Sequence, residues 1–300
     1  MTVVNLEVPV RLQAFALLRA LRVHQWVKNL LVFVPVLLDH RLQLPVLARA
    51  GLAFAAFCCA ASGGYVLNDL LDLEADRKHS VKRHRPFAAN LLSRSFGIVL
   101  VPLLFAAALL CSLWLSPRFL ALLGLYLVLT TAYSVYLKRV AILDVILLAG
   151  LYTLRVLAGV AASHVRFSTW LLAFSMFLFL SLAFLKRYAE LSELPAAADG
   201  LARRGYIRGD REWLGSMGGS SGYLSVLVLA LYISSEQVVA LYGTPLLLWL
   251  ICPLLLFWVS RMWMLGHRGR MNQDPIVAAV RDPASYVIGA VVALILYVAA

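Results

Sequence analysis

Charged side chains are scarce in this sequence. They make up 14% of its 300 residues, and apolar side chains make up 62%. A soluble domain carries about 25% charged residues and about 45–50% apolar ones. Acidic residues are the scarcer sign, with 15 against 27 basic residues. This composition excludes an ordinary soluble domain and predicts an integral membrane protein.

Cysteine and histidine are too few and too scattered for familiar metal or nucleophile sites. The four cysteines lie inside apolar runs, where packing is their expected role, at Cys58, Cys59, Cys111 and Cys252. The six histidines show no ligand spacing, and no nucleophile stands in a recognisable pattern with a base. Any chemistry must therefore depend on other residue types.

Runs of roughly 17–25 apolar residues, the length that crosses a bilayer, predict about nine membrane-spanning helices. Their centres lie near Val32, Ala55, Leu104, Val128, Leu148, Met176, Val228, Leu250 and Val292. We expect a single all-α, polytopic membrane domain over residues 1–300. Within it, residues 11–25 are predicted to form an interfacial helix, and the long polar connections at 68–95 and 186–216 a cytoplasmic cap.

Basic residues are distributed unequally between the two sides of the predicted bundle. Of the 27 basic residues, 22 lie in the N-terminal segment and the even-numbered connections. The opposite side has only Arg41, Arg49, Arg118 and Arg166. Because basic connections stay in the cytoplasm, we expect a cytoplasmic N-terminus in the inner (plasma) membrane. This distribution also argues that the net charge of +12 reflects membrane topology and not nucleic-acid binding.

Acidic residues are concentrated between Asn68 and Asp76. Asn68, Asp72 and Asp76 recur every four residues, which places them on one helical face with Asp69 beside them. Oxygen ligands at this density suit Mg²⁺, with Mn²⁺ as a second choice, and such a metal commonly recruits phosphates. The alternative is a helix end that is simply solvated by its own charges.

Basic side chains follow this acidic stretch directly, at Lys82, Arg83, His84 and Arg85. Such a run is commonly a patch that faces lipid headgroups, but beside a metal site it favours binding of a diphosphate. Lys28 and Asn29 lie just inside the first predicted span. For Lys28, snorkelling to the interface is an equally good explanation.

Two charges lie in or near the fifth predicted span. Asp144 and Arg155 are eleven residues apart, which returns to nearly the same helical face and separates them by about 16 Å. A charge inside the membrane normally faces a cavity or a partner, so Arg155 is either an anion ligand or half of an ion pair. Lys186, Arg187 and Glu190 leave the sixth predicted span.

These residues together resemble the UbiA superfamily of intramembrane prenyltransferases. The first acidic motif of that family, Asn-Asp-x-x-Asp-x-x-x-Asp, matches Asn68, Asp69, Asp72 and Asp76. The resemblance implies a nine-helix bundle around a central cavity beneath a polar cap. It also implies a second aspartate-rich motif after the sixth span, where this sequence has Lys186 to Leu191 instead.

In this respect the sequence is closer to the decaprenyl-phosphate phosphoribosyltransferase branch of the family. The resemblance rests on Arg22-x-His24-Gln25-Trp26-Val27-Lys28-Asn29, Lys82-Arg83-His84-Arg85-Pro86 and Lys186 to Leu191. It implies transfer of a phosphoribosyl group from phosphoribosyl diphosphate (PRPP) to a polyprenyl phosphate for cell envelope biosynthesis. Asp69, Asp72 and Asp76 are then the catalytic candidates and, with Asn68, the metal ligands. The candidates for substrate binding are Lys28, Asn29, Lys82, Arg85, Tyr133, Lys138, Asp144, Arg155, Lys186, Arg187 and Glu190.

Two other functions remain open at this stage. A prenyltransferase that joins a polyprenyl diphosphate to an aromatic acceptor would use the same acidic motif. A transporter of lipids or organic anions would use Asp144 and Arg155 along its pathway, although the charges cluster on one side. The expected partners are PRPP, polyprenyl phosphate and membrane lipids, without nucleic acid, and homo-oligomerisation is left open.

Overall fold

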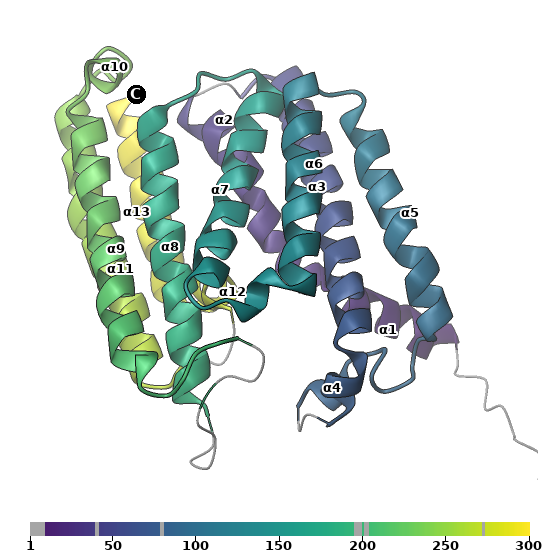
Figure 1. Ribbon diagram of the computed structural model, residues 1–300. Helices are drawn as coiled ribbons and strands as arrows, with labels where there is room; N and C mark the ends of the chain where they lie inside the picture. Colours follow the sequence, from purple (N-terminus) through teal and green to yellow (C-terminus); the bar gives the residue numbers. More distant parts are fainter. Residues whose placement is uncertain (1–9, 40–41, 79–80, 195–199, 201–203, 272–273) are drawn as a thin grey trace, which may run out of the picture. The chain divides into compact units, whose positions relative to one another are not determined.

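The computed structural model describes residues 10–39, 42–78, 81–194, 200, 204–271 and 274–300 (Figure 1). Within these residues the only β-type pairing is one isolated bridge between Gly200 and Ile207. The all-α prediction is confirmed. Positions 79–80, 195–199 and 201–203 of the predicted polar connections lie outside the described residues.

Seven described helices are long and apolar enough to cross a membrane. They are α3 (Leu44–Leu71), α5 (Arg94–Ser112), α6 (Pro117–Val135), α7 (Leu143–Ser163), α8 (Thr169–Ser192), α9 (Asp210–Ile233), and Pro245–His267, which joins η4 (Pro245–Leu250) to α11 (Ile251–His267). Two bent pairs raise the number to nine, if each pair is one span. The first pair, Ala14–Leu21 with Val23–Leu38, bends by 43°. The last pair, α12 (Pro275–Arg281) with α13 (Pro283–Ala299), bends by 80°. The prediction of about nine spans is confirmed, with the first and last of them broken.

Serine residues begin three of the spans by capping the helix. Ser93, Ser116 and Ser168 accept a backbone N–H three residues ahead, at 3.1, 3.1 and 3.3 Å. Each bond satisfies one of the N–H groups that a helix start leaves without an intrahelical partner. At α6 the cap is followed by Pro117 at the first helical position, where its missing N–H costs nothing.

The chain divides into two compact units, and unit 1 comprises Met1–Tyr136 with Ala158–Val165. It contains α1 (Val10–Leu21), η1 (Val23–Phe33), α2 (Val34–Leu38), α3, α4 (Leu73–Lys78), η2 (Lys82–His84), α5 and α6. α3 is its centre and packs against η1, α1, α5 and α6. At Gly159 a Cβ would lie 2.1 Å from the carbonyl oxygen of Val32, so glycine allows this close backbone approach.

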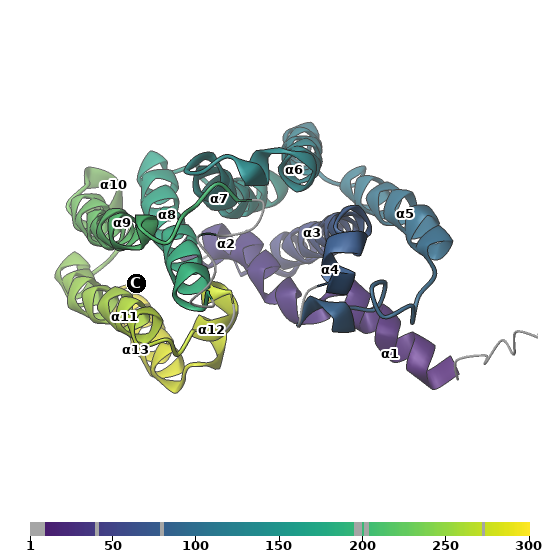
Figure 2. The same cartoon turned by 60° about the horizontal axis from the view of Figure 1, so that its bottom comes forward.

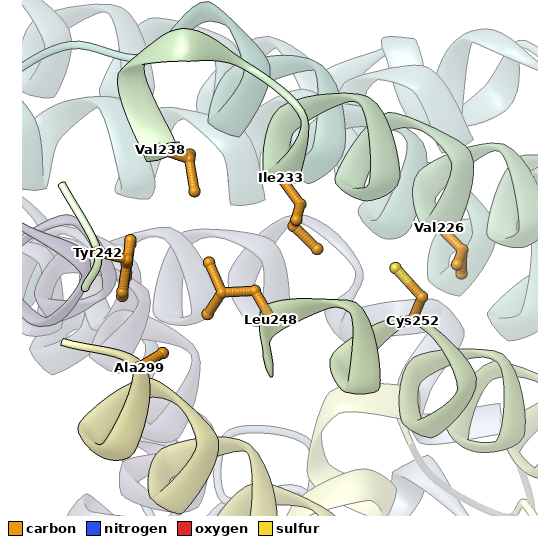
Figure 3. Packing of buried hydrophobic residues seen from close by; sticks show 7 residues of the cluster. All are labelled: Val226, Ile233, Val238, Tyr242, Leu248, Cys252 and Ala299. Carbon is orange, nitrogen blue, oxygen red and sulfur yellow. The ribbon is translucent and has the colours of Figure 1, made fainter. Parts of the chain in front are cut away.

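Unit 2 comprises Leu137–Leu157 and Arg166–Ala300. It contains η3 (Leu137–Arg139), α7 as far as Leu157, α8, α9, α10 (Glu236–Val239), η4 (Pro245–Leu250), α11 (Ile251–His267), α12 (Pro275–Arg281) and α13 (Pro283–Ala299). α8 and α9 lie side by side, and α11 packs against both α9 and α13 (Figure 2). An apolar cluster ties α9, α10, η4, α11 and α13 together (Figure 3); it contains Val226, Ile233, Val238, Tyr242, Leu248, Cys252 and Ala299.

Small residues let the helices of unit 2 approach closely. Gly218 and Gly222 lie one turn apart on α9, a spacing typical of helix contacts in membranes. A Cβ at Gly218 would lie 2.2 Å from the ring of Trp263 and 2.7 Å from Phe184. Trp263 cannot easily yield, because its indole N–H donates to Ser181 Oγ at 3.0 Å. The contact between α8, α9 and α11 therefore depends on glycine, which has no side chain, at position 218.

Gly218→Ala is expected to lower the thermal unfolding temperature of the protein in detergent. The added methyl overpacks the interface, and such changes cost about 1–3 kcal/mol. The matched control is Gly219→Ala, because a Cβ at this neighbouring position meets nothing within 4 Å. Alanine there should be neutral or slightly stabilising, since it favours helix by up to about 1 kcal/mol over glycine. Equal unfolding temperatures for the two variants would contradict this packing.

Candidate functional site

The acidic motif lies where α3 ends. The structure interrupts the helix at Asp72, which has φ −96° and ψ 6°, and α4 begins at Leu73. The backbone still follows the helical hydrogen-bond pattern, since Asp72 N–H reaches Asn68 O at 3.0 Å and Asp76 N–H reaches Asp72 O at 2.8 Å. The motif thus occupies a bend between two helices and not one continuous helix.

Two carboxylates of the motif converge on one cation. Arg85 Nη1 lies 3.0 Å from Asp69 Oδ1 and 2.7 Å from Asp76 Oδ2. Arg22 adds a second cation, with its Nη2 2.6 Å from Asp69 Oδ1 and its guanidinium 4.9 Å from the centre of the Tyr65 ring. Both carboxylates are buried, whereas both arginines are partly exposed. We call Asp69, Asp76, Arg22 and Arg85 the acidic cluster.

An apolar anchor brings Arg85 to this position. The residues that follow it, Phe87 and Ala88, are buried against Ala20, Val66 and Leu73 of α1, α3 and α4. Burial of these side chains supplies the free energy that holds an otherwise polar connection against the end of α3. The basic run therefore reaches the carboxylates because hydrophobic residues directly after it are fixed.

The acidic cluster has the donor set that a magnesium ion takes. Carboxylates of Asp69 and Asp76 already point at one positive group, and Asn68 and Asp72 adjoin them in sequence. Mg²⁺ is commonly held by one or two carboxylates and completes its shell with water and phosphate. Among the described residues no group of three or more His, Cys, Asp or Glu side chains is preformed as a metal site. Two carboxylates with added phosphate oxygens fit the residues present.

A second charged group lies in unit 2, at the end of α8. Arg187 is fully buried, and its Nε donates to Asp144 Oδ2 at 2.6 Å while its Nη1 pairs with Glu190. Arg204 lies 3.6 Å from Glu190 and 3.9 Å from Asp144. Tyr206 donates its hydroxyl to Asp144 Oδ1 at 2.6 Å. We call these five residues the arginine cluster.

The hydroxyl of Tyr206 also accepts the backbone N–H of Ile142 at 2.8 Å. Burial, together with the hydrogen bond to Asp144, raises the pKa of Tyr206 above its ordinary value. The phenol therefore remains protonated across the physiological range and acts as a donor. Burial of Asp144 is tolerated because a cation and a hydroxyl satisfy its two oxygens.

Lys186 takes a different partner from its neighbour Arg187. Its Nζ lies 2.8 Å from Asp274 Oδ2, and the hydroxyl of Tyr152 approaches the same oxygen at 3.4 Å. Asp274 also caps α12 by accepting the N–H of Ile276 at 3.3 Å. Two adjacent cations of α8 are thus directed to carboxylates of two different elements, α7 and the start of α12.

The remaining predicted site residues are distributed over η1, η2, η3, α6 and α7. Lys28 and Asn29 are buried in η1, where Asn29 donates to Cys58 Sγ at 3.3 Å. Arg155 is buried in α7, donates to Leu151 O at 2.6 Å and lies 5.7 Å from the centre of the Tyr152 ring. Lys138 is buried in η3, Tyr133 is half-buried on α6 and Lys82 is exposed in η2. These assignments stay predictions.

Four residues of these groups are absent from the predicted set. Arg22 stands within the motif already quoted, and Asp274 has the sequence signal of a helix cap, an aspartate directly before proline. Arg204 and Tyr206 carry no such signal beyond glycines at 200, 205 and 209. Their contact with Asp144 joins residues about 60 positions apart, and only folding brings them together.

A family model described as the UbiA prenyltransferase family matches residues 30–281. The chain belongs to the UbiA prenyltransferase family. Family membership and its apolar helices make it an integral membrane protein. The resemblance found in the sequence is thereby confirmed.

Curated relatives match this chain at 37–38% identity over the aligned residues. It is 38% identical over 269 residues to the nodulation protein NoeC of Azorhizobium caulinodans, covering 89% of this chain and 88% of NoeC. It is also 38% identical to the uncharacterized protein y4nM of Sinorhizobium fredii, covering 92% of this chain and 54% of y4nM. This chain therefore spans about half the length of y4nM. A decaprenyl-phosphate phosphoribosyltransferase of Mycolicibacterium smegmatis is 37% identical over 180 residues, covering 58% of this chain and 57% of that protein.

Solved structures share the fold. A UbiA homolog from Archaeoglobus fulgidus bound to GPP and Mg²⁺ matches with a TM-score of 0.69 and 16% identity, covering 95% of this chain and 98% of that one. The same homolog bound to Cd²⁺ also gives 0.69 at 16% identity, covering 94% of this chain and 99% of that one. The TM-scores show a common fold at this low sequence identity, and both of these structures hold a divalent metal.

Substitution of Arg85 tests whether the acidic cluster binds a metal ion, and the test needs no substrate. Arg85→Ala removes the cation shared by Asp69 and Asp76, so the protein should unfold at a lower temperature in metal-free detergent buffer. Millimolar Mg²⁺ or Mn²⁺ should recover part of that loss, because a divalent ion takes the place of the guanidinium between the carboxylates. Thermal unfolding across a magnesium titration measures both effects.

Arg83→Ala is the matched control, because the Arg83 side chain contacts His84 and is exposed. It should change neither the unfolding temperature nor its response to magnesium. If Arg85→Ala responds to magnesium no more than Arg83→Ala does, the acidic cluster is not the metal site.

Proposed function

We propose that this protein transfers a 5-phosphoribosyl group from PRPP to a polyprenyl phosphate, with Mg²⁺ as cofactor. An oxygen of the lipid phosphate bonds to C1 of the ribose, and the bond from C1 to the diphosphate breaks. The phosphate is already an anion, so no general base is required. The work left to the protein is to position two anionic substrates and to neutralise the departing diphosphate.

The observation that carries the proposal is the group of basic side chains at the end of α8 and in the segment that follows it. Lys186 and Arg204 each have 26% of their side chain exposed beside the buried Arg187. They are held by carboxylates yet accessible, which suits cations that bind phosphate oxygens. Arg187 is fully buried between Asp144 and Glu190 and helps to hold these side chains in place. A donor with a phosphate in addition to its diphosphate, as PRPP has, makes use of such cations.

The acidic cluster takes the diphosphate in this proposal. Asp69 and Asp76, with Asn68 and Asp72, would hold the metal, and Arg22 and Arg85 would contact phosphate oxygens. A bound Mg²⁺ supplies charge neutralisation on the leaving diphosphate. The similarity to decaprenyl-phosphate phosphoribosyltransferase supports the choice of donor, although it covers 58% of the chain.

Prenyl transfer is the second candidate, and the structural neighbour bound to GPP and Mg²⁺ favours it. A prenyl diphosphate would use the same acidic cluster, and an aromatic compound would be the acceptor. The two functions differ in the donor, so donor choice decides between them.

The decisive experiment offers the purified chain, reconstituted in lipid nanodiscs, either PRPP with polyprenyl phosphate or a prenyl diphosphate with an aromatic acid. We expect diphosphate release from PRPP that requires both polyprenyl phosphate and Mg²⁺. Asp72→Ala should reduce it by about ten- to a hundredfold, as expected when a metal-site partner is lost. Glu74→Ala is the matched control, since Glu74 is an exposed acid of the same stretch that pairs only locally with Arg77. Prenyl transfer without reaction of PRPP would overturn the proposal.

We also propose that the N-terminus and the segment 68–95 face the cytoplasm, which the excess of basic residues on that side supports. Val81 is 72% exposed and lies in this segment, whereas Trp114 is 74% exposed and lies in the next connection. A cysteine at Val81 should resist a membrane-impermeant maleimide in intact cells and react after permeabilisation. A cysteine at Trp114 should react in both. The reverse pattern would invert the orientation.

A further inference from the structure

Tyr206 is a buried residue of unit 2 whose hydroxyl makes two hydrogen bonds. It is 3% exposed and packs with Val145, Leu191 and Leu214. Its hydroxyl accepts from Ile142 N–H and donates to Asp144 Oδ1. One phenol oxygen therefore joins the segment between α8 and α9 to the start of α7 at two points.

The turn that Tyr206 contacts is strained. Ile142 has a φ of +68°, in the left-handed region that a β-branched residue rarely adopts. Such a conformation persists only where surrounding contacts hold it. The hydrogen bond from Ile142 N–H to Tyr206 is one of these contacts, and the strained turn immediately precedes Asp144 in the first turn of α7.

The segment around Tyr206 is fitted to the same turn through its backbone. Gly205 has a φ of +67°, and a Cβ there would lie 2.8 Å from the carbonyl oxygen of Arg139. A bridge between Gly200 and Ile207 and a bond from Ile207 N–H to Asp210 Oδ2 at 2.9 Å close the segment on either side. Glycine at 205 permits the approach, and the Tyr206 hydroxyl fixes its register.

Arg204 lies close to this attachment. It stands two residues before Tyr206 and lies 3.6 Å from Glu190 and 3.9 Å from Asp144. Both Tyr206 and Arg204 therefore meet Asp144, one through a short hydrogen bond and the other through a longer ion pair. A shift of Tyr206 would move Arg204 away from the arginine cluster, while Arg187 would keep its own bonds to Asp144 and Glu190.

We propose that Tyr206 is a positioning residue that holds Arg204 for the binding of a phosphate group. It acts through its hydroxyl bonds to Asp144 and Ile142 and does not touch the substrate. The inference rests on the proposed function for the identity of the donor, but the attachment itself and anion binding can be tested without turnover.

The first test measures the attachment. Tyr206→Phe keeps the ring and removes the hydroxyl, so hydrogen–deuterium exchange of the Ile142 amide should become faster. Tyr242→Phe is the matched control, because Tyr242 is likewise buried in unit 2 but belongs to the apolar cluster of Figure 3. It should leave exchange at Ile142 unchanged. Equal exchange at Ile142 in wild type and Tyr206→Phe would overturn the proposal.

The second test measures phosphate binding with PRPP as substrate. Tyr206→Phe should raise KM for PRPP about tenfold, the effect of losing one charge-assisted contact, and change kcat less than about twofold. Arg204→Ala should do the same. The double variant should be no worse than either single variant, because both substitutions remove the same contact. Additive losses, or a fall in kcat alone, would show a role that does not pass through Arg204.

A third measurement separates failure of this inference from failure of the proposed donor. Inorganic phosphate should raise the unfolding temperature of the wild type and of Tyr242→Phe, and raise that of Tyr206→Phe and Arg204→Ala less. If PRPP is not a substrate but this difference is found, the donor is wrong and the positioning role stands. If PRPP is a substrate and Tyr206→Phe matches Tyr242→Phe in KM and in stabilisation, the positioning role is wrong.

Discussion

A charge buried in a mostly apolar helical protein must meet an opposite charge or a hydrogen-bond donor, and the Asp144–Arg187 pair shows how strongly this shapes the fold. Both side chains are fully buried, 2.6 Å apart, on α7 and α8. Burial of either charge without its partner would be strongly unfavourable. Each remaining oxygen or nitrogen needs a further partner, and Glu190, Tyr206 and Arg204 supply them.

The same constraint arranges the acidic cluster in unit 1. Asp69 and Asp76 are buried, and the arginines that neutralise them come from separate segments, before α3 and after α4. The carboxylates are close together because one guanidinium holds them, which is also the arrangement that a divalent ion requires. A site for a cation and a site for an anionic substrate can thus be built from the same residues, since arginines that pair with carboxylates can also bind phosphate.

Close helix contacts give these charged groups a fixed frame. Without a hydrophobic driving force between helices in lipid, association depends on packing and on hydrogen bonds between them. Gly218 allows Trp263 and Phe184 to approach α9, and the indole N–H of Trp263 bonds to Ser181 on α8. α8 carries Lys186 and Arg187 at its end, so the small residues of α9 help to fix the helix from which those cations extend.

Composition, apolar run length and the acidic motif determined the all-α membrane fold, the number of spans and the family, because these properties depend on residue type and on spacing along one helix. The motif also indicated a cation site near Asp69, Asp72 and Asp76. Only the tertiary structure decided the partners: Arg22 and Arg85 for Asp69, Arg187 and Tyr206 for Asp144, and Asp274 for Lys186. Likewise, the four-residue periodicity of the motif does not predict the break of the helix at Asp72. Pairing of these charges joins positions up to 88 residues apart, and the sequence alone offers many cations for each carboxylate, whereas packing selects one or two.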